Sequence, residues 1–383
     1  MSFELLVPVD EEVLLPFKSL PKQILGKQIL IHTKSEGIPE LQGLRMAIVG
    51  VHEVRNSYPA RLSNDLINFR KVFYEMYPGN WKLNIADLGD LPNGETTEDT
   101  YFALKEICLH LRQINILPII IGGSQDLVYP LYQSFQITEQ LVNIISVDNR
   151  FDFSQEDELI SGRSYMSKII METPNYLNNY SNIGYQSYYC AQEEKDLMEK
   201  LYFDSLRLGT ILDNVALAEP LLRDADIVGF DMKVLDWQSH GDFENGQPNG
   251  IDSRTICSLS RYAGISDRVS LFGLFELPTT TLFNKLLAQI IWYFIEGVNC
   301  RFNEYPVAID DNFVKYTVAL SDRSMVFFKS EVSQRWWMEV VNDNEVNNKS
   351  KSFALLPCMQ NDYDDACRDQ IPERWYNAIK RIK

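Results

Sequence analysis

The chain has 383 residues, of which 45% are hydrophobic and 23% charged, so it is long enough for one large globular domain or two ordinary ones. Its net charge of −17 argues against binding to nucleic acid or to an anionic membrane surface, because both need clustered cations. The six cysteines show no CxxC spacing, no run reaches the ~18 apolar residues of a membrane span, and the first residues lack the basic and apolar regions of a signal peptide. We therefore expect a cytoplasmic protein with reduced cysteines and no membrane span.

Apolar periodicity predicts an alternation of strands and helices over residues 43–300. Residues 1–42 are irregular and predict an N-terminal arm across the core, with a short strand near Gln28–His32. The strands expected after the arm span residues 45–52, 83–88, 117–121, 143–152, 182–188, 227–235 and 269–277. The expected helices span residues 63–77, 97–113, 127–134, 191–203, 253–263 and 281–298, with one more inside 153–180. This order predicts an α/β fold, a three-layer α/β/α sandwich with a mostly parallel sheet.

The last part of the chain, residues 301–383, breaks this order and predicts a small α+β extension packed on the domain. Residues 316–320 and 325–329 flank a polar turn and are typical of a hairpin, residues 342–352 form a polar loop, and a short helix follows Pro372. In a strand, Trp336 and Trp337 would point to opposite sides, so one of them is either an interface anchor or part of a packed extension. We expect the extension to bind a protein partner or to form a homo-oligomer.

Charged or polar residues follow three of the predicted strands. GGSQD follows the strand 117–121, DNRFD closes the apolar run that begins at Asn143, and DMKVLD closes the strand 227–235. In open α/β sheets, ligand sites form at the carboxyl ends of the strands. Because side chains two apart on a strand share a face, Asp148, Arg150 and Asp152 should emerge together if the extended geometry continues.

In this order, the three segments resemble the motifs of the ureohydrolase superfamily, which comprises arginase, agmatinase and formimidoylglutamase. The family's GG-x-H-[DS], D-A-H-x-D and D-x-D-x-x-D stand here as GGSQD, DNRFD and DMKVLD, and the resemblance covers roughly residues 43–300. The loop 245–251 and the segment Phe275–Pro278 also look like family features. The resemblance implies an arginase-like fold, in which Glu276 contacts the guanidinium or amidine group of the substrate.

The departures from the family pattern concern the metal site. The family holds two manganese ions with two His and four Asp. Three of these positions keep an aspartate here: Asp148, Asp152 and Asp231. The other three carry a different residue: Gln125, Arg150 and Lys233. A guanidinium or an ammonium group has no lone pair to offer a cation, so the mapping predicts a degenerate site without manganese. The family's catalytic histidine has no counterpart, because residues 161–164 (SGRS) occupy its region.

Three crowded carboxylates without cations need compensating charge or bound protons. We hypothesise that Arg150 and Lys233 enter the metal cavity and form buried ion pairs with the three aspartates. Gln125 would then fill the space of the missing histidine and hydrogen-bond there. Glu276 would either persist as a binding residue or pair with Arg163 or Arg150.

Two alternatives keep chemistry at these positions. In the first, a residual single-metal site uses Asp148, Asp152 and Asp231, with Asp126 and Asp236 as further candidate ligands and manganese as the cofactor. In the second, a desolvated Lys233 acts as base or nucleophile, although neighbouring carboxylates raise the pKa of a lysine and oppose this role.

The leading interpretation is a catalytically inactive ureohydrolase-fold protein, a pseudoenzyme without a cofactor that has a scaffold, regulatory or binding role. The alternative is an active hydrolase of the formimidoylglutamase or agmatinase type, which cleaves C–N bonds of linear amidines at an atypical metal site. A third hypothesis is a sensor that retains the cleft and uses Glu276 to read a small cationic ligand.

Overall fold

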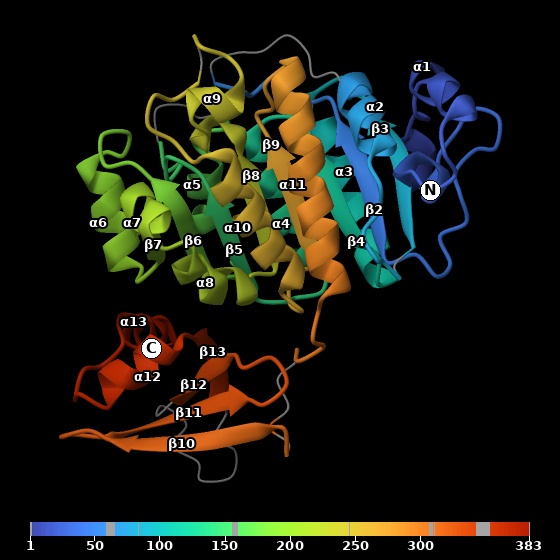
Figure 1. Cartoon of the computed structure of the whole chain (residues 1–383). Helices are drawn as coiled ribbons and strands as arrows, with labels where there is room; N and C mark the ends of the chain where they lie inside the picture. The colour runs from blue at the N-terminus through green and yellow to red at the C-terminus, as the bar shows by residue number, and fades with distance from the viewer. Residues whose placement is uncertain are drawn as a thin grey trace.

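The computed structural model describes residues 2–58, 66–82, 84–154, 160–244, 246–305, 309, 311–341 and 353–382. One large sheet lies between two layers of helices, and a second, smaller sheet is formed by the end of the chain (Figure 1). The large sheet has nine strands, and all of their pairings are parallel. The predicted α/β/α architecture is therefore confirmed.

The strands of the large sheet lie in the order β1-β3-β2-β4-β9-β8-β5-β6-β7. Their bounds are β1 Leu30–Ile31, β2 Met46–Val51, β3 Ile85–Leu91, β4 Leu117–Ile121, β5 Val142–Val147, β6 Leu177–Tyr185, β7 Asp204–Arg207, β8 Ile227–Asp231 and β9 Leu271–Phe275. The four strands β4, β9, β8 and β5 are consecutive neighbours in the middle of the sheet. Because they are parallel, the loops that follow them meet at one edge.

Helices cover both faces of the sheet, and each face has its own apolar cluster. One face carries α2 Ile67–Glu75, α7 Leu208–Asp213, α8 Glu219–Arg223, α10 Ser253–Ile265 and α11 Thr281–Asn299. The other carries α3 Thr97–Gln113, α4 Val128–Gln136, α5 Tyr165–Met171 and α6 Gln192–Lys200. The short helices α1 Glu11–Leu14 and α9 Trp237–His240 lie at the N-terminal arm and after β8, and the 3-10 turns are η1 Ser2–Leu5, η2 Leu15–Ser19, η3 Leu25–Lys27, η4 Gln125–Leu127, η5 Val215–Ala218 and η6 Met232–Val234.

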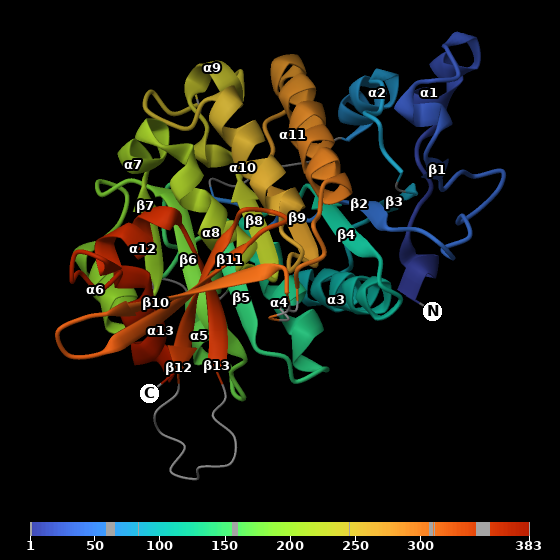
Figure 2. The same cartoon turned by 60° about the horizontal axis from the view of Figure 1, so that its bottom comes forward.

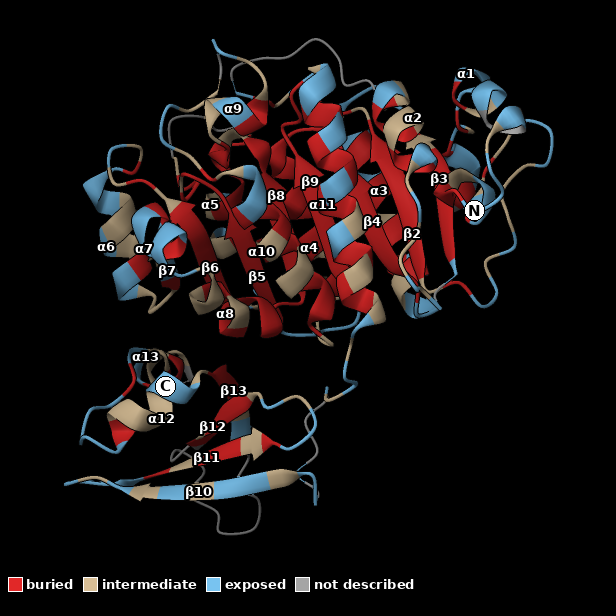
Figure 3. Cartoon of the chain, viewed as in Figure 1, coloured by how far each residue is buried: buried red, intermediate tan, exposed pale blue. Residues whose placement is uncertain are grey.

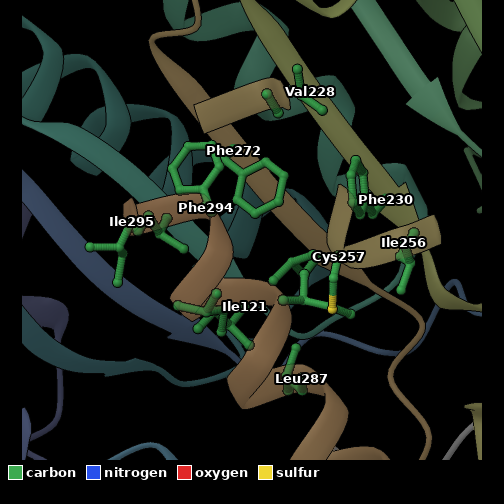
Figure 4. Packing of buried hydrophobic residues seen from close by; sticks show 14 of the residues in the cluster. Ile121, Val228, Phe230, Ile256, Cys257, Phe272, Leu287, Phe294 and Ile295 are labelled. Atoms are coloured by element: carbon green, nitrogen blue, oxygen red, sulfur yellow. The ribbon is translucent and has the colours of Figure 1, made fainter. Parts of the chain in front are cut away.

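Aromatic packing joins α11 to the middle of the sheet (Figure 4). The ring of Phe272 on β9 stacks on that of Phe294 on α11, with centroids 4.0 Å apart, and it meets the ring of Phe230 on β8 edge-on at 5.2 Å. All three side chains are fully buried, and each such burial stabilises the fold by roughly 1.5–3 kcal/mol. β8 and β9 are buried along their whole lengths (Figure 3), and they pair in parallel from Ile227 opposite Leu271 to Asp231 opposite Phe275.

The helices α10 and α11 approach each other closely at two glycines. A Cβ on Gly297 would lie 2.5 Å from the carbonyl oxygen of Arg261, and one on Gly264 would lie 2.2 Å from that of Phe294. No side chain fits at either position without moving the helix backbone. This contact fixes the layer that supports β8 and β9.

The end of the chain folds into a four-stranded antiparallel sheet in the order β10-β11-β12-β13, followed by two helices. The elements are β10 Phe313–Ala319, β11 Ser324–Ser330, β12 Trp336–Val341, β13 Phe353–Cys358, α12 Gln360–Ala366 and α13 Glu373–Ile382. β10 and β11 form the predicted hairpin, with Phe313 opposite Ser330 and Ala319 opposite Ser324. Trp336 and Trp337 point to opposite faces of the sheet, as predicted, but both are buried.

The extension docks at the end of the large sheet where its strands begin (Figure 2). Arg223, which ends α8 and precedes β8, donates from Nη2 to the carbonyl of Cys358 at 2.9 Å, and its guanidinium lies 4.5 Å from the ring centroid of Trp337. On α13, Arg381 lies 3.6 Å from Asp204 at the start of β7. The loops after β4, β5, β8 and β9 lie at the other end of the same sheet.

The strands β5 and β8 end sooner than predicted, because an aspartate captures a backbone amide at each end. The amide of Arg150 donates to Asp148 Oδ1 at 3.0 Å. The amide of Lys233 donates to Asp231 Oδ1 at 2.7 Å. Such local bonds replace those of the strand ladder and turn the chain. The prediction of extended geometry as far as Asp152 was therefore wrong, and the alternation of side-chain faces does not apply there.

Several short elements were not predicted: the helices α1, α7, α8, α9 and α12 and the strands β7 and β13. Each has four to seven residues, too few for a clear apolar period. The predicted loop 342–352, residue 83 of a predicted strand, residues 63–65 of a predicted helix and residue 245 lie outside the described residues. Among the described residues, no helix is both long and apolar enough to cross a membrane.

Candidate functional site

Four loops bring the predicted site residues together at the carboxyl ends of the central strands. Gln125 follows β4 in η4, Asp148 and Asp152 follow β5, Asp231 ends β8, and Glu276 follows β9. All five side chains are buried. The backbone amide of Glu276 donates to the carbonyl of Gly123 at 2.9 Å, which ties the loop after β9 to the loop after β4. The sheet order therefore creates the site that the three motifs predicted.

The loop after β4 depends on glycine. Gly123 has a φ of +81°, in the left-handed region, and a Cβ there would lie 2.8 Å from the carbonyl oxygen of Glu53. The sharp turn places the next residues of the motif, from Ser124 to Asp126, against the core. Burial raises the pKa of Asp126 to about 6, and this carboxyl accepts hydrogen bonds from Tyr101 and Asn56.

The three aspartates lie in a protein environment that favours their protonated forms. Removal from water raises the pKa of Asp152 to about 7 and that of Asp231 to about 8. The pKa of Asp148 lies well above its ordinary value, through burial and then through the neighbouring Asp152. The nearby positive charge of Lys233 lowers all three pKa values, but this effect is smaller than the increase caused by burial. Burial is therefore the largest influence on the protonation of these three carboxyl groups.

Lys233 forms an ion pair with Glu276, not with the aspartates. Its Nζ lies 2.9 Å from Glu276 Oε2, and Glu276 is completely buried while about a fifth of the Lys233 side chain is exposed (22%). Glu276 Oε1 also accepts a hydrogen bond from the backbone amide of Gln125 at 3.3 Å. The predicted pairing of Glu276 with Arg163 or Arg150 was wrong, because β8 and β9 are neighbours and place Lys233 nearer.

Arg150 turns away from the aspartates. Its Nη1 donates to the carbonyl of Tyr189 at 3.0 Å, and its guanidinium lies 4.4 Å from the centroid of the same ring. No carboxylate of the described residues lies within ion-pair distance of it. The predicted ion pair of Arg150 with Asp148, Asp152 or Asp231 was wrong, because the chain leaves the strand before Arg150.

Gln125 lies in the core of the site and is hydrogen-bonded there. Its Nε2 donates to Ser146 Oγ at 3.2 Å and to the hydroxyl of Tyr165 at 3.3 Å. Gln125 thus makes the hydrogen bonds expected of a residue that fills this space. Tyr165, which opens α5, was not singled out in the sequence, because a tyrosine in an apolar helix gives no signal of a site.

Two site residues adopt left-handed backbone conformations. Asp152 has a φ of +59° and Glu276 a φ of +55°. Non-glycine residues persist in this region only where the surrounding structure enforces it, often at functional sites. This strain was not readable from the sequence, and it shows that the loops after β5 and β9 are held in specific shapes.

The donors present do not fit a pair of manganese ions. Manganese prefers carboxylate, carbonyl, imidazole and water ligands, whereas an ammonium group, Lys233, stands among the carboxylates and a guanidinium, Arg150, replaces a histidine. Among the described residues, no three His, Cys, Asp or Glu side chains gather in a way that could hold a metal ion. Of the histidines, His32 contacts the carbonyl of Leu88 and His52 contacts Asp90, both on β3, which β2 separates from β4.

Solved structures with the same architecture reveal the fold family. The structure of Trypanosoma cruzi formiminoglutamase with Mn2+ has a TM-score of 0.64 at 15% identity, over 73% of this chain and 99% of that one. Formimidoylglutamase from Bacillus subtilis has a TM-score of 0.64 at 13% identity, over 74% of this chain and 94% of that one. The chain has the ureohydrolase fold. The agmatine ureohydrolase of Thermoplasma volcanium is also similar, with a TM-score of 0.57 at 14% identity, over 76% of this chain and 98% of that one.

The ureohydrolase fold was predicted from the strand-end motifs, and the structural similarity confirms it. Comparison of the sequence with protein-family models finds no match, and comparison with curated proteins finds none either. At this level of identity the likeness concerns the fold, so the activity is argued below from the site itself.

Proposed function

We propose that this protein is a ureohydrolase-fold pseudoenzyme: it keeps the fold, does not hydrolyse amidines, and has a scaffold, regulatory or binding role. The observation that carries the proposal is the 2.9 Å ion pair between Lys233 and the buried Glu276. The family resemblance implies that Glu276 contacts a cationic group of the substrate and that a metal-ligating aspartate stands at the position of Lys233. The ammonium group of Lys233 occupies Glu276 and cannot bind a metal ion, so it opposes both functions.

Electrostatics supports the same proposal. Lys233 already supplies positive charge to Asp148, Asp152 and Asp231, since its charge lowers the pKa of each of these carboxyl groups. The ammonium group of Lys233 would also repel an entering cation. These features disfavour the alternative of an active hydrolase with manganese.

The sensor hypothesis receives little support from this geometry. A guanidinium or amidine ligand would have to displace Lys233 from Glu276, and Lys233 is covalently tethered and so present at a high effective concentration. We therefore propose that the protein acts through its outer surface, which binds a protein partner or forms a homo-oligomer. A cytoplasmic location fits the six cysteines, none of which forms a disulfide.

Metal loading tests the proposal directly. The purified protein is incubated with excess manganese, desalted, and analysed for bound metal and for release of urea, ammonia or formamide from arginine, agmatine and formiminoglutamate. We expect neither stoichiometric manganese nor hydrolysis. Near-stoichiometric manganese together with hydrolysis would overturn the proposal in favour of the active enzyme.

A reconstructed site provides the matched positive control. The triple variant Gln125→His, Arg150→His and Lys233→Asp restores the family's ligand types at three positions. We expect it to bind more manganese than the unmodified chain, because it replaces two positive charges and an amide by metal-ligating groups. Equal metal uptake by both proteins would contradict the view that these residues keep metal out.

A further inference from the structure

A cavity of about 250 Å³ lies between the large domain and the extension, at the end of the sheet opposite the candidate site. The domain contributes Arg223, Arg268 and the segment that follows α11, including Glu304 and Tyr305. The extension contributes its sheet face, with Trp337 at the wall. Domain junctions are frequent locations of small-molecule sites, and this volume lies just below the roughly 300 Å³ at which drug-sized pockets begin.

Some of the charges around the cavity are already matched within the protein. Arg268 pairs with Asp224 at 2.9 Å and with Asp226 at 2.8 Å. Asp267 accepts hydrogen bonds from the backbone amides of Asn303 and Glu304, both at 2.9 Å. These charged groups already have partners within the protein, so they do not require a ligand.

Two guanidinium groups on one side are not fully matched. Arg223 is more than nine-tenths buried (7% exposed), and its Nη1 has no hydrogen-bond partner in the described structure. Its Nε lies 3.3 Å from Glu219 Oε1, and Nε of Arg335 lies 3.2 Å from the same oxygen. Two positive charges therefore share one carboxylate, which leaves a positive surplus and unused N–H donors.

One carboxylate oxygen of the cavity lining is a hydrogen-bond acceptor that lacks a donor. Glu304 Oε1 accepts a hydrogen bond from Ser330, but its Oε2 is buried and has no hydrogen-bond partner in the described structure. Buried polar atoms in proteins nearly always have a partner, so unmatched atoms of both signs around one cavity are informative. They call for a ligand that carries both an anionic and a cationic group.

We propose that this cavity binds a small zwitterion of amino-acid size. The ligand's carboxylate would accept hydrogen bonds from Arg223 and Arg335, as guanidinium groups bind carboxylates in paired geometry. Its ammonium group would donate to Glu304, and its side chain would lie against the rings of Trp337 and Tyr305. This inference goes beyond the proposed function and does not depend on it, because the two sites lie at opposite ends of the sheet.

Thermal unfolding and calorimetry of the full chain test the proposal. Each of the common L-amino acids is added separately at about 5 mM, and inorganic phosphate and agmatine are added as purely anionic and purely cationic probes. We expect at least one amino acid to raise Tm by about 3 °C or more and to bind saturably, since a ligand that binds only the folded state stabilises it. Neither phosphate nor agmatine should match that effect.

Substitutions locate the binding. Glu304→Gln and Arg335→Gln should each weaken the affinity about tenfold or more, because each removes a charged hydrogen-bond partner. Glu331→Gln and Arg368→Gln, at exposed positions of the extension, serve as matched controls and should leave it unchanged. If one of the test variants does not fold, Tyr305→Ala, at a half-exposed tyrosine, provides a further test of lost affinity.

The proposal is overturned if no amino acid binds, or if binding survives Glu304→Gln and Arg335→Gln undiminished. Phosphate that stabilises the chain as well as the best amino acid would also overturn it, because that result describes a simple anion site. Lys233→Met should retain amino-acid binding. Loss of binding in a folded Lys233→Met protein would place the ligand at the candidate site around Lys233 and would overturn this proposal. The metal-loading test of the proposed function would not be affected by that result.

Discussion

The Nζ of Lys233 lies 2.9 Å from Oε2 of Glu276, across the ends of the neighbouring strands β8 and β9. Glu276 has no exposed surface, so its negative charge depends on partners inside the protein. Lys233 supplies a full positive charge to this carboxylate, and the backbone amide of Gln125 donates a hydrogen bond to it. We therefore expect the pair to stabilise the loops that follow β8 and β9.

Lys233→Met should destabilise the protein by about 3–5 kcal/mol, because it removes the ammonium group that pairs with the buried carboxylate of Glu276. The free energy of unfolding in urea measures the effect. Lys34→Met, at an exposed lysine of the arm, is the matched control and should change it by less than about 0.5 kcal/mol. The double variant Lys233→Met with Glu276→Gln should recover part of the loss, and a Lys233→Met protein as stable as the parent would contradict the assignment.

The stability should fall as pH rises from about 4 to about 8, because of the buried carboxyl groups of Asp152 and Asp231. Burial raises the folded-state pKa of Asp152 to about 7 and of Asp231 to about 8, above their unfolded values near 4. A raised pKa means that the folded state binds the proton more tightly, so the contribution is complete below about pH 4 and is lost as pH rises through the folded pKa. Each group adds a slope of up to about 1.4 kcal/mol per pH unit.

Asp152→Asn tests the assignment of this slope, because asparagine cannot ionise and tolerates the left-handed backbone of this position. Urea unfolding at several pH values should give a flatter decline for the variant than for the parent. Asp196→Asn, on an exposed helix, should leave the parent slope unchanged. Identical slopes for the parent and Asp152→Asn would refute the contribution of this carboxyl.

Arg70→Met should destabilise the other side of the sheet by about 3–5 kcal/mol. Arg70 is buried, donates from Nε to Asp87 at 2.9 Å, and donates from Nη1 to Asp90 at 2.9 Å. Burial by itself raises the pKa of Asp90, but the hydrogen bond from His52 and the charge of Arg70 lower it to about 2.

Because the folded pKa of Asp90 is depressed, its contribution is present above about pH 4 and is lost as pH falls through about 2. The parent should therefore lose stability on acidification in this window, and Arg70→Met should lose less. Acid titration followed by circular dichroism measures the difference. Arg368→Met, at a side chain that is 70% exposed, is the control and should unfold with the parent's acid profile.

Gly297→Ala should destabilise the protein by about 1–3 kcal/mol, although alanine is the better helix former. The new Cβ would lie 2.5 Å from the carbonyl of Arg261 and would force α10 and α11 apart. Gly209→Ala in α7 is the matched control, since a Cβ there meets no atom within 4 Å and should stabilise the helix by about 0.5–1 kcal/mol. In urea unfolding, we expect Gly297→Ala to lower the free energy of unfolding and Gly209→Ala to raise it. A stabilised Gly297→Ala protein would contradict the close helix contact.

The apolar periodicity of the sequence was sufficient to predict the parallel sheet, the flanking helices and the C-terminal hairpin. Helix α3 and strand β4 begin and end at the predicted residues. These elements are predictable because burial on one face of a helix, or on both faces of a central strand, leaves a local pattern in the sequence. The motifs also predicted which side chains meet at the strand ends, since parallel strands bring their carboxyl ends to one edge.

The chemistry of single residues was equally readable: a lysine and an arginine at ligand positions argue against a metal site wherever their side chains point. Their partners were not readable. Glu276 reaches Lys233 because β9 lies beside β8, and Arg150 reaches Tyr189 because the chain turns at Asp148. Strand order, turns and the docking of the extension depend on contacts between distant segments, so only the tertiary structure decided which charge meets which.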